Sequence, residues 1–539
     1  MRIKDVFGYI KFGLSESRRY TICYFIVAVL YLSIGFAMPY ISGIYVDRLV
    51  TDADMDIIWM FVLAFAVVYI VQSVIYLGWN LISSLFSNTF FYHMVINPVR
   101  HIMKSRFSKY HNMESAKLVN QLRDDGVTFL TFVQATLSAA TGLVTILLGI
   151  GFLFFIDVFV GVLIFATLPL YLLLYLGFRK KLYEKDKVFR EKSDIYFSKR
   201  NEQLNRMAFV KRNELSEELG QRVDVAFNDF ISKNLSLNFV EFFFTHSGRL
   251  TSAAFHVIII GVGGYRVIHG DLSIGYFTMI TLYFNMVIQQ VGSLFGFASG
   301  YQSVRVATGR TEEIYENPID PNGETKIEHI QQLEVRDLSL CYGDNKVFSG
   351  INKTFEVGKM YAICGENGSG KSSFLNCIVG LYGDISTGDI LFDGVSMNDI
   401  DMAYMRRNRM SFVEQSPEFL SMSIGDYLNF GIEQSETTNR NKHELISALG
   451  ISKFDFEDTI TESGSNYSGG EKQKLTIVRA LSKDCAIAIL DEPTSALDTD
   501  SVDALADMLT KQKVNRITLI ISHDARILSR CDEEWRIDS

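Results

Sequence analysis

At 539 residues the chain is too long for a single hydrophobic core, so we expect two or more folded units. Hydrophobic residues make up 48% of the sequence and charged residues 21%, with a mean hydropathy of +0.15, which excludes a disordered chain and argues against an ordinary soluble enzyme. The net charge of −9 gives no support to a nucleic-acid-binding protein. The six scattered cysteines, without a CxxC pair, indicate neither a disulfide framework nor a structural zinc site.

Six runs in the first 300 residues are nearly free of charge, and each reaches or approaches the roughly 20 residues that a helix needs to cross a bilayer. They are Thr21–Val50, Ile57–Trp79, Leu137–Ile156, Val158–Phe178, Thr251–Ile268 and Ile274–Ser299. The last 200 residues contain no such run, so buried core helices do not explain the pattern. We therefore predict six membrane-spanning helices. The first run is too long for a signal peptide and lacks a cleavage site.

Lysine and arginine residues predict the orientation of these helices. Five lie in residues 1–20, six in residues 80–131 and fifteen in residues 179–250, whereas the alternate connections carry only Arg48 and Arg266 among several aspartates. Because connections rich in Lys and Arg stay in the cytoplasm, both termini and both long connections are expected inside, in a bacterial-type cytoplasmic (inner) membrane.

The two long inner connections have few Gly or Pro residues and carry mixed charge at helical spacing. We interpret each as two helices that continue out of the membrane and meet at a short crosswise element. The sequence places these elements near Met113–Leu118 and near Asn205–Lys211.

The composition changes near residue 313. Residues 313–330 contain Pro318, Pro321 and Gly323, although the whole chain has only seven prolines, which indicates a linker. Beyond it apolar strands alternate with helical stretches, as in a soluble α/β domain. The predicted organisation is a membrane domain over residues 1–312, a linker over 313–330 and an α/β domain over 331–539.

The strongest chemical signal is a GxxxxGKS loop between the apolar strand Met360–Cys364 and a helix-like stretch from Ser373. Backbone N–H groups of such a loop surround phosphate oxygens. Lys371 supplies positive charge for the β- and γ-phosphates, and the Ser372 hydroxyl can ligate Mg²⁺. The candidate phosphate-binding residues are Gly365, Glu366, Asn367, Gly368, Ser369, Gly370, Lys371, Ser372 and Ser373.

Two further elements extend this site. The apolar strand Ala486–Leu490 ends in Asp491, which would hold Mg²⁺ or its water, and Glu492, which would polarise an attacking water. Between the two motifs, a Ser-Gly-Gly sequence opens a helix, where exposed N–H groups and the positive helix end favour an anion. Its residues are Ser468, Gly469 and Gly470.

Together these motifs resemble those of ABC transporters of the exporter type, in which one membrane domain is fused to one nucleotide-binding domain. Tyr467–Glu471 corresponds to the signature motif, usually LSGGQ, with Tyr for Leu and Glu for Gln. Thr461–Gly464 resembles the acidic stretch before that signature, although Thr461 replaces the usual Gly, and Gly264–Gly275 resembles the exporter pattern between the fifth and sixth helices. The implied fold is a polytopic α-helical membrane domain of six helices plus an α/β P-loop nucleotide-binding domain.

The resemblance also assigns roles to single residues. It implies that Tyr342 stacks on adenine, that Gln415 couples Mg²⁺ to the membrane domain, and that Asp498 belongs to a loop crossing a dimer interface. His523 matches the switch histidine that contacts the γ-phosphate, and Glu492 is the expected catalytic base. The implied cofactors are ATP and Mg²⁺. The metal ligands would be Ser372, Gln415 and Asp491.

The resemblance implies an ATP hydrolase that drives export of a small molecule, peptide or lipid-like compound by alternating access. Six helices are half the number that this fold uses to enclose a path, and Ser468 and Gly469 of one chain would complete the ATP site at Lys371 of another. A second half-transporter is therefore expected, with a homodimer favoured over a heterodimer. An ATP-gated regulator or channel stays open as an alternative, and an importer is disfavoured.

The transported substrate is not identified by the sequence. Polar residues that could line a path are Asn285, Gln289, Gln290, Ser138, Thr141 and Thr145, although hydrogen bonding between helices is the favoured interpretation. Mid-span charges are absent from the predicted helices, which argues against strongly charged cargo. Because the sequence stops at Ser539, we expect short or missing C-terminal helices, and we expect no leader-cleaving peptidase domain.

Overall fold

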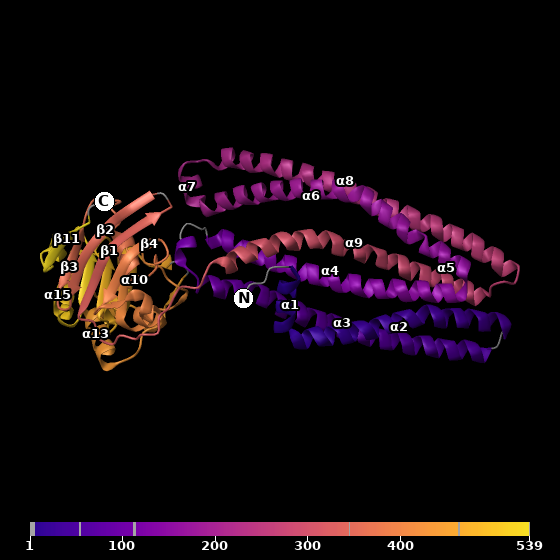
Figure 1. Ribbon diagram of the computed structural model, residues 1–539, viewed down its shortest axis with the longest axis horizontal. Coiled ribbons are helices and arrows are strands. Elements are labelled where there is room, and N and C mark those ends of the chain that lie inside the picture. The colour runs from indigo at the N-terminus through magenta and orange to yellow at the C-terminus, as the bar shows by residue number, and fades with distance from the viewer. Residues whose placement is uncertain (1–5, 53–54, 111–114, 344, 462–463, 538–539) are drawn as a thin grey trace. The chain divides into compact units, whose positions relative to one another are not determined.

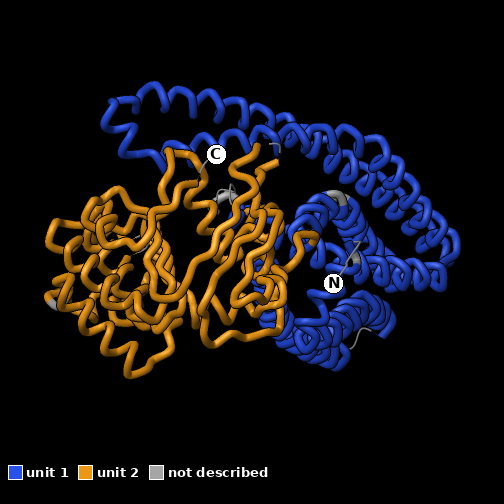
Figure 2. The backbone as a smooth tube through the Cα atoms, turned by 60° about the vertical axis from the view of Figure 1, so that its left-hand side comes forward, with its two compact units in different colours: residues 1–100, 115–315 blue, residues 101–114, 316–539 orange. Residues whose placement is uncertain are grey.

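The computed structural model describes residues 6–52, 55–110, 115–343, 345–461 and 464–537. The chain divides into two compact units, coloured differently in Figure 2. One comprises Met1–Arg100 and Ser115–Tyr315, and the other comprises His101–Glu114 and Glu316–Ser539. The connection between two long helices of the first unit is thereby part of the second.

The first unit is built from long helices that run beside one another (Figure 1). The connection between α6 and α8 contains the short helix α7, in agreement with the crosswise element predicted near Asn205–Lys211. The helices are α1 (Val6–Glu16), α2 (Arg18–Thr51), α3 (Met55–Ile102), α4 (Ser115–Ile156), α5 (Val158–Phe165), α6 (Thr167–Asn205), α7 (Met207–Arg212), α8 (Ser216–Ile268) and α9 (Ile274–Glu316).

Five stretches of the described chain are long and apolar enough to cross a membrane, namely α2, α3, α4 from Leu118 onward, α5 with α6, and α8. The sixth predicted span belongs to α9, which is 43 residues long. Its apolar part is interrupted by Asn285, Gln289 and Gln290, which lower its mean hydropathy. The count of six spans is therefore approximate, and the multi-pass helical architecture agrees with the prediction.

Polar side chains secure the turns between these helices. Asp47 of α2 accepts hydrogen bonds from the Ser273 hydroxyl and from the Gly275 backbone N–H, both at 2.6 Å, and so holds the start of α9. Asp157 caps α5 by accepting from the Val160 N–H at 3.0 Å. Its other carboxylate oxygen pairs with Arg266 near the end of α8. These contacts satisfy helix ends that would otherwise leave backbone groups without partners.

The crosswise element predicted near Met113–Leu118 is misplaced. Residues 113–114 lie outside the described part of the chain, and Ser115–Leu118 begin α4. The short helical turn of this connection is η1 (Phe107–Lys109), which lies earlier.

Backbone pairing with the segment after α9 fixes this connection. The Arg106 N–H donates to the Pro318 carbonyl at 3.1 Å, the Asp320 N–H donates to the Lys104 carbonyl at 2.9 Å, and Ser105 forms an antiparallel bridge with Ile319. The helix α9 itself continues to Glu316, through the first residues of the predicted linker.

The second unit contains two main sheets. A parallel sheet has the strand order β11-β3-β10-β9-β6, and an antiparallel sheet has the order β2-β1-β4-β5. All residues of β9 and β10 are buried, as expected for central parallel strands covered on both faces. The strands are β1 (Gln332–Tyr342), β2 (Asn345–Glu356), β3 (Met360–Cys364), β4 (Ser386–Phe392), β5 (Val395–Ser396), β6 (Met410–Val413), β7 (Met422–Ser423), β8 (Thr459–Ile460), β9 (Ile487–Asp491), β10 (Ile517–Ile521) and β11 (Glu533–Arg536).

Helices pack against the parallel sheet, and three of them begin after its strands β3, β9 and β10. Their apolar residues, among them Phe374 of α10 and Leu475 of α14, are fully buried in the unit's core. The helices are α10 (Lys371–Val379), α11 (Met402–Tyr404), α12 (Ile424–Asn429), α13 (Glu436–Ala448), α14 (Gly469–Ser482), α15 (Thr499–Gln512) and α16 (Ala525–Leu528). Single turns lie at η2 (Met397–Asp399), η3 (Met405–Arg409), η4 (Ile451–Lys453) and η6 (Lys513–Asn515).

Candidate functional site

The glycine-rich loop lies where the sequence places it, between the end of β3 at Cys364 and the start of α10 at Lys371. Gly365, Gly368 and Gly370 have φ angles of +150°, +87° and +87°, a region that favours glycine. A Cβ atom on Gly365 would lie 2.7 Å from the Ser369 hydroxyl oxygen and 2.8 Å from a backbone oxygen. The glycines therefore let the backbone close tightly at the N-terminus of α10.

This loop fits a phosphate chain. The Lys371 ammonium donates to the carbonyls of Gly365 and Glu366 at 2.9 and 2.8 Å, so it lies over the loop. The buried hydroxyl of Ser369 has no hydrogen-bond partner within the described chain. Phosphate oxygens would accept from both groups and from the N–H groups at the positive end of α10.

Two predicted metal ligands meet beside the loop. Asp491 ends β9 and is 7% exposed, and the Ser372 side chain hydrogen-bonds to its carboxylate. Burial raises the pKa of Asp491 above its usual value, while the hydrogen bond from Ser372 and the charge of Lys371 pull that pKa back down. A carboxylate and a hydroxyl brought together from two elements are oxygen ligands of the kind that Mg²⁺ takes.

Three predicted site residues, the catalytic base Glu492, the Mg²⁺ ligand Gln415 and the switch histidine His523, also lie close together. The Gln415 side-chain amide donates to one Glu492 carboxylate oxygen at 3.0 Å, and the Nε2 atom of His523 lies 3.9 Å from the other. Glu492 has a φ of +45°, which is uncommon for a residue other than glycine, and its N–H donates to the Ile521 carbonyl at 2.9 Å. Strain of this kind often accompanies a functional position.

The signature residues form a second group. Ser468 caps α14, and its hydroxyl and backbone exchange hydrogen bonds with Glu471 in a complete capping box. A Cβ atom on Gly470 would lie 2.7 Å from the Ala496 carbonyl oxygen, so this helix start abuts the loop before Asp498. Within the described chain, no hydrogen bond joins Ser468, Gly469 or Gly470 to Lys371.

Two side chains that contact predicted site residues were not predicted from the sequence. Lys474 donates to the Asp498 carboxylate at 2.7 Å, which lowers the pKa of Asp498 below its usual range. Tyr382 is 1% exposed and its ring lies against Tyr342, the predicted adenine platform, with centroids 5.8 Å apart. Both contacts join residues distant in sequence, so no local pattern indicated them. The capping box, by contrast, has a local sequence signal, which is the S-x-x-E spacing of Ser468 and Glu471.

Two of the polar residues that could line a path, Thr141 and Thr145, form hydrogen bonds within their own helix. The Thr145 hydroxyl donates to the Thr141 carbonyl at 3.0 Å, and the Thr141 hydroxyl donates to the Leu137 carbonyl at 3.0 Å. These hydroxyls are satisfied by their own helix, as is common for threonine in apolar helices, so the favoured hydrogen bonding between helices is wrong for them.

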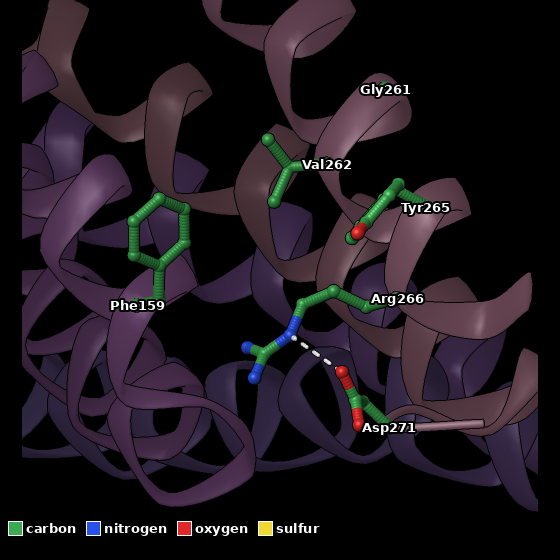
Figure 3. Close-up of a pocket in the computed structure, with 6 residues that line it drawn as sticks. All are labelled: Phe159, Gly261, Val262, Tyr265, Arg266 and Asp271. Atoms are coloured by element: carbon green, nitrogen blue, oxygen red, sulfur yellow. Dashed lines mark ion pairs between the residues drawn. The ribbon is translucent and has the colours of Figure 1, made fainter. Parts of the chain in front are cut away.

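A pocket of about 490 Å³ in the first unit is lined by residues other than the predicted ATP-site residues (Figure 3). Phe159 of α5 faces it from one side, and the Arg266 Nε atom lies 4.0 Å from a carboxylate oxygen of the neighbouring Asp271. Because Arg266 also pairs with Asp157, its positive charge is balanced within the protein. The lining residues are Phe159, Gly261, Val262, Tyr265, Arg266 and Asp271.

Comparison with known proteins decides the family. Residues 21–291 match the family described as ABC transporter transmembrane region, and residues 348–495 match the family described as ABC transporter. The chain belongs to the ABC transporter family. This confirms the predicted class, which is one of ATP-hydrolysing transporters. The solved structure of a bacterial Atm1-family ABC exporter with ATP bound matches with a TM-score of 0.84 at 17% identity, covering 97% of this chain and 93% of that one, and confirms the predicted fold.

Curated relatives carry the names of transport proteins. The chain is 27% identical over 451 residues to a Bacillus subtilis (strain 168) protein named as a probable multidrug resistance ABC transporter, across 81% of this chain and 66% of that protein. It is 22% identical to the transport/processing protein ComA of Streptococcus pneumoniae R6, across 92% and 70%. It is 29% identical to the ATP-dependent lipid A-core flippase of Syntrophus aciditrophicus, across 51% and 47%. The chain thus spans about two thirds of the Bacillus protein and about half of the flippase.

Proposed function

We propose that the chain is a half-transporter that uses ATP hydrolysis to export a small molecule, peptide or lipid-like compound across the cytoplasmic membrane. The observation that carries this proposal is the meeting of Glu492 with Gln415 and His523 beside the Ser372–Asp491 pair. The names of the relatives, which cover multidrug resistance, transport/processing and a lipid A-core flippase, support export but do not agree on one substrate.

The geometry supports a division of labour within the ATP site. Lys371 and the N–H groups of its loop would hold the β- and γ-phosphates, and Ser372 with Asp491 would hold Mg²⁺, with Gln415 as the predicted third ligand. Bound Mg²⁺ would supply charge neutralisation on the phosphate oxygens. The Glu492 carboxylate would accept a proton from the attacking water, and His523 would orient toward the γ-phosphate.

We further propose that two chains share each ATP site. Ser468, Gly469 and Gly470 form a group of their own around Ala496 and Asp498, with anion-binding N–H groups at the start of α14. A partner chain would bring this group to the phosphates held at Lys371. A homodimer is the simplest arrangement, because this chain contains both halves of the site.

A heterodimer is the second candidate. Tyr467 stands where the signature usually has Leu, and its ring contacts Phe454 with centroids 5.9 Å apart. A signature altered in this way could serve one of two unequal sites. A regulator or channel gated by ATP would use the same residues but would move no substrate against a gradient.

The proposed organisation keeps the predicted domains: a membrane domain over residues 1–312, a linker over 313–330 and a nucleotide-binding domain over 331–539. Both termini and the nucleotide-binding domain would lie in the cytoplasm of a bacterial-type cell. The bias of Lys and Arg toward the long connections supports this orientation.

The first experiment is ATP hydrolysis by the purified chain in lipid nanodiscs, with Glu492→Gln as the control. Turnover that this variant loses supports a self-sufficient homodimer, and inactive folded protein favours a missing partner. ATP-dependent uptake of candidate compounds into inside-out vesicles then separates an exporter from a gate. ATP-dependent opening without uptake would contradict export.

A further inference from the structure

Tyr382 connects two parts of the second unit that the sequence does not associate. It follows α10 and its side chain is 1% exposed. On one side its ring meets Tyr342 at 5.8 Å between centroids, nearly perpendicular at 81°. On the other it meets Phe107, from the connection between α3 and α4, at 6.2 Å and 35°. Tyr382 therefore bridges the predicted adenine platform and that connection.

Further contacts hold Tyr382 and its neighbours in place. The Tyr382 carbonyl accepts from the N–H groups of Ile385 and Ser386 at 3.1 and 3.0 Å. Burial raises the pKa of the Tyr382 phenol, hydrogen bonding with Tyr342 raises it further, and a hydrogen bond with Asn376 of α10 lowers it. The tyrosine is thus attached to the helix that begins at Lys371 as well as to the platform.

The connection between α3 and α4 makes a second contact beside the first. The Ser108 hydroxyl, next to Phe107, donates to the carboxylate of Asp384, two residues after Tyr382. Backbone bonds of Lys104 and Arg106 with the segment after α9 hold the same connection in the second unit. The contacts of Lys104, Arg106 and Ser108 therefore fix the position of Phe107, in addition to its own ring contact with Tyr382.

We propose that Tyr382 is a positioning residue through which Phe107 sets the orientation of the Tyr342 ring, and hence how tightly the nucleobase is held. The proposal rests on the proposed function in one respect, the stacking of Tyr342 on adenine. By thermodynamic reciprocity, a base bound on Tyr342 then also biases the position of the connection between two membrane helices. Binding of the base, in addition to binding of the phosphates, would thereby influence the membrane helices of the first unit.

The test isolates the contribution of the base. The full chain carrying Glu492→Gln, in nanodiscs, is titrated with Mg-ATP and with magnesium tripolyphosphate, which has the phosphates and no base. The ratio of the two apparent Kd values reports how much the base adds. An aromatic pair contributes a free energy equivalent to about a two- to tenfold change in affinity. Phe107→Ala should lower the ATP preference by about that factor.

A matched control shares the same connection. Met103 is 80% exposed and Phe107 39% exposed, so neither substitution removes a buried side chain. Met103→Ala should leave the ratio as it is in the parent chain. Tyr382→Leu should lower the ratio at least as far as Phe107→Ala, whereas Tyr382→Phe, which keeps the ring, should retain most of it. If Tyr382→Leu does not fold, the exposed Phe107 still provides the test.

Three results would overturn the proposal, each for a different reason. If Tyr342→Ala lowers the ratio and Phe107→Ala does not, Tyr342 holds the base but the connection does not act on it. If Tyr342→Ala leaves the ratio unchanged, the adenine assignment fails and the relay with it, while the roles of Lys371 and Glu492 are tested separately by hydrolysis. An equal loss of affinity for ATP and tripolyphosphate in Phe107→Ala would also contradict it, because that pattern reflects a general distortion of the site.

Discussion

At the scale of single residues, Glu492 is the group whose chemistry is most specific. Its carboxylate lies within reach of Gln415 and His523, at the end of the strand that also carries Asp491. Glu492→Gln keeps the size and the hydrogen-bonding capacity of the side chain but removes the base. We expect ATP affinity to be retained and turnover to fall by about 100-fold or more. Steady-state hydrolysis and nucleotide binding on the same preparation measure both, and undiminished hydrolysis would remove Glu492 from the mechanism.

Substitution of Lys371 should affect nucleotide binding rather than the chemical step. Its ammonium lies over the loop that would cradle the phosphates, so its charge acts on bound nucleotide before any chemistry. Lys371→Ala should weaken Mg-ATP binding itself, by about tenfold or more, since a hydrogen bond to a charged group is lost. Binding measured by titration tests this. An unchanged Kd would show that the phosphates lie elsewhere.

The Ser372–Asp491 pair predicts a pH dependence. Burial raises the pKa of Asp491, so its protonated fraction, which cannot bind a cation, persists to higher pH than for an exposed aspartate. The Ser372 hydrogen bond opposes this shift. Ser372→Ala should therefore move the acid limb of the kcat/KM profile to higher pH and increase the Mg²⁺ requirement. If Ser372→Ala lowers the maximal kcat/KM but leaves the pH midpoint of the acid limb unchanged, Ser372 does not set the Asp491 pKa.

Residue identities were predictable where a motif is local. The loop from Gly365 to Ser372 and the Asp491–Glu492 pair are contiguous patterns, and the structure brings them to the same strand ends. Lys474 and Tyr382 were not predicted because each acts through a partner tens of residues away. The roles proposed for the local motifs stay predictions until hydrolysis is measured.

At the scale of elements, the start of α14 depends on Glu471, at a position where the signature motif usually has Gln. Glu471 stands where Gln is common, and its carboxylate accepts from the Ser468 N–H at 2.9 Å. Glu471→Ala should destabilise the second unit by about 1 kcal/mol, through loss of half the capping box. Glu471→Gln, which can still accept that bond, should be nearly neutral. Thermal unfolding of the purified chain should show a decrease of about 2–4 °C for Ala alone.

An equal effect of the two substitutions would contradict the capping role. In that case the negative charge of Glu471 at the start of the helix, rather than its hydrogen bond, would carry the stability. Raising the ionic strength distinguishes the two, because screening weakens the charge effect and leaves the hydrogen bond.

Element boundaries were predicted less well than element types. The apolar runs predicted the long helices, because length and lack of charge are local properties. The crosswise element of the first connection was placed too late, since pairing of Arg106 with Pro318 and of Lys104 with Asp320 decides where that chain turns. Such pairing is invisible to helical spacing. The corresponding element at α7 has no partner of this kind among its described backbone bonds, and its prediction agreed with the structure.

At the scale of the whole molecule, the arrangement of the two groups of site residues bears on assembly. One group contains Lys371, Asp491 and Glu492, and the other begins at Ser468 and reaches Asp498. If one chain completes the site of another, a defect in one group and a defect in the other should leave an intact site only when the two defects lie on different chains of the dimer. A complementation measurement requires no knowledge of the transported substrate, and it separates a homodimer from a heterodimer.

The measurement uses two differently tagged copies of the full chain, co-expressed and purified through both tags. One copy carries Lys371→Ala and the other Ser468→Arg, so a mixed dimer keeps one site in which both groups are intact. Its hydrolysis should reach about half the wild-type rate, whereas each variant alone should be nearly inactive. The matched control pairs a double variant with a wild-type chain, which leaves both shared sites broken with the same two substitutions.

Activity in the control arrangement and its loss in the trans arrangement would show that each site is built within one chain. Failure of the two tagged copies to purify together would favour a heterodimer, because a second copy would then not be the natural partner. Activity in the trans arrangement and its loss in the control would establish at once that Lys371 and Ser468 act on the same ATP and that they come from different chains. The six predicted spans, half the number that the resemblance implies for enclosing a path, lead independently to the same expectation of two chains.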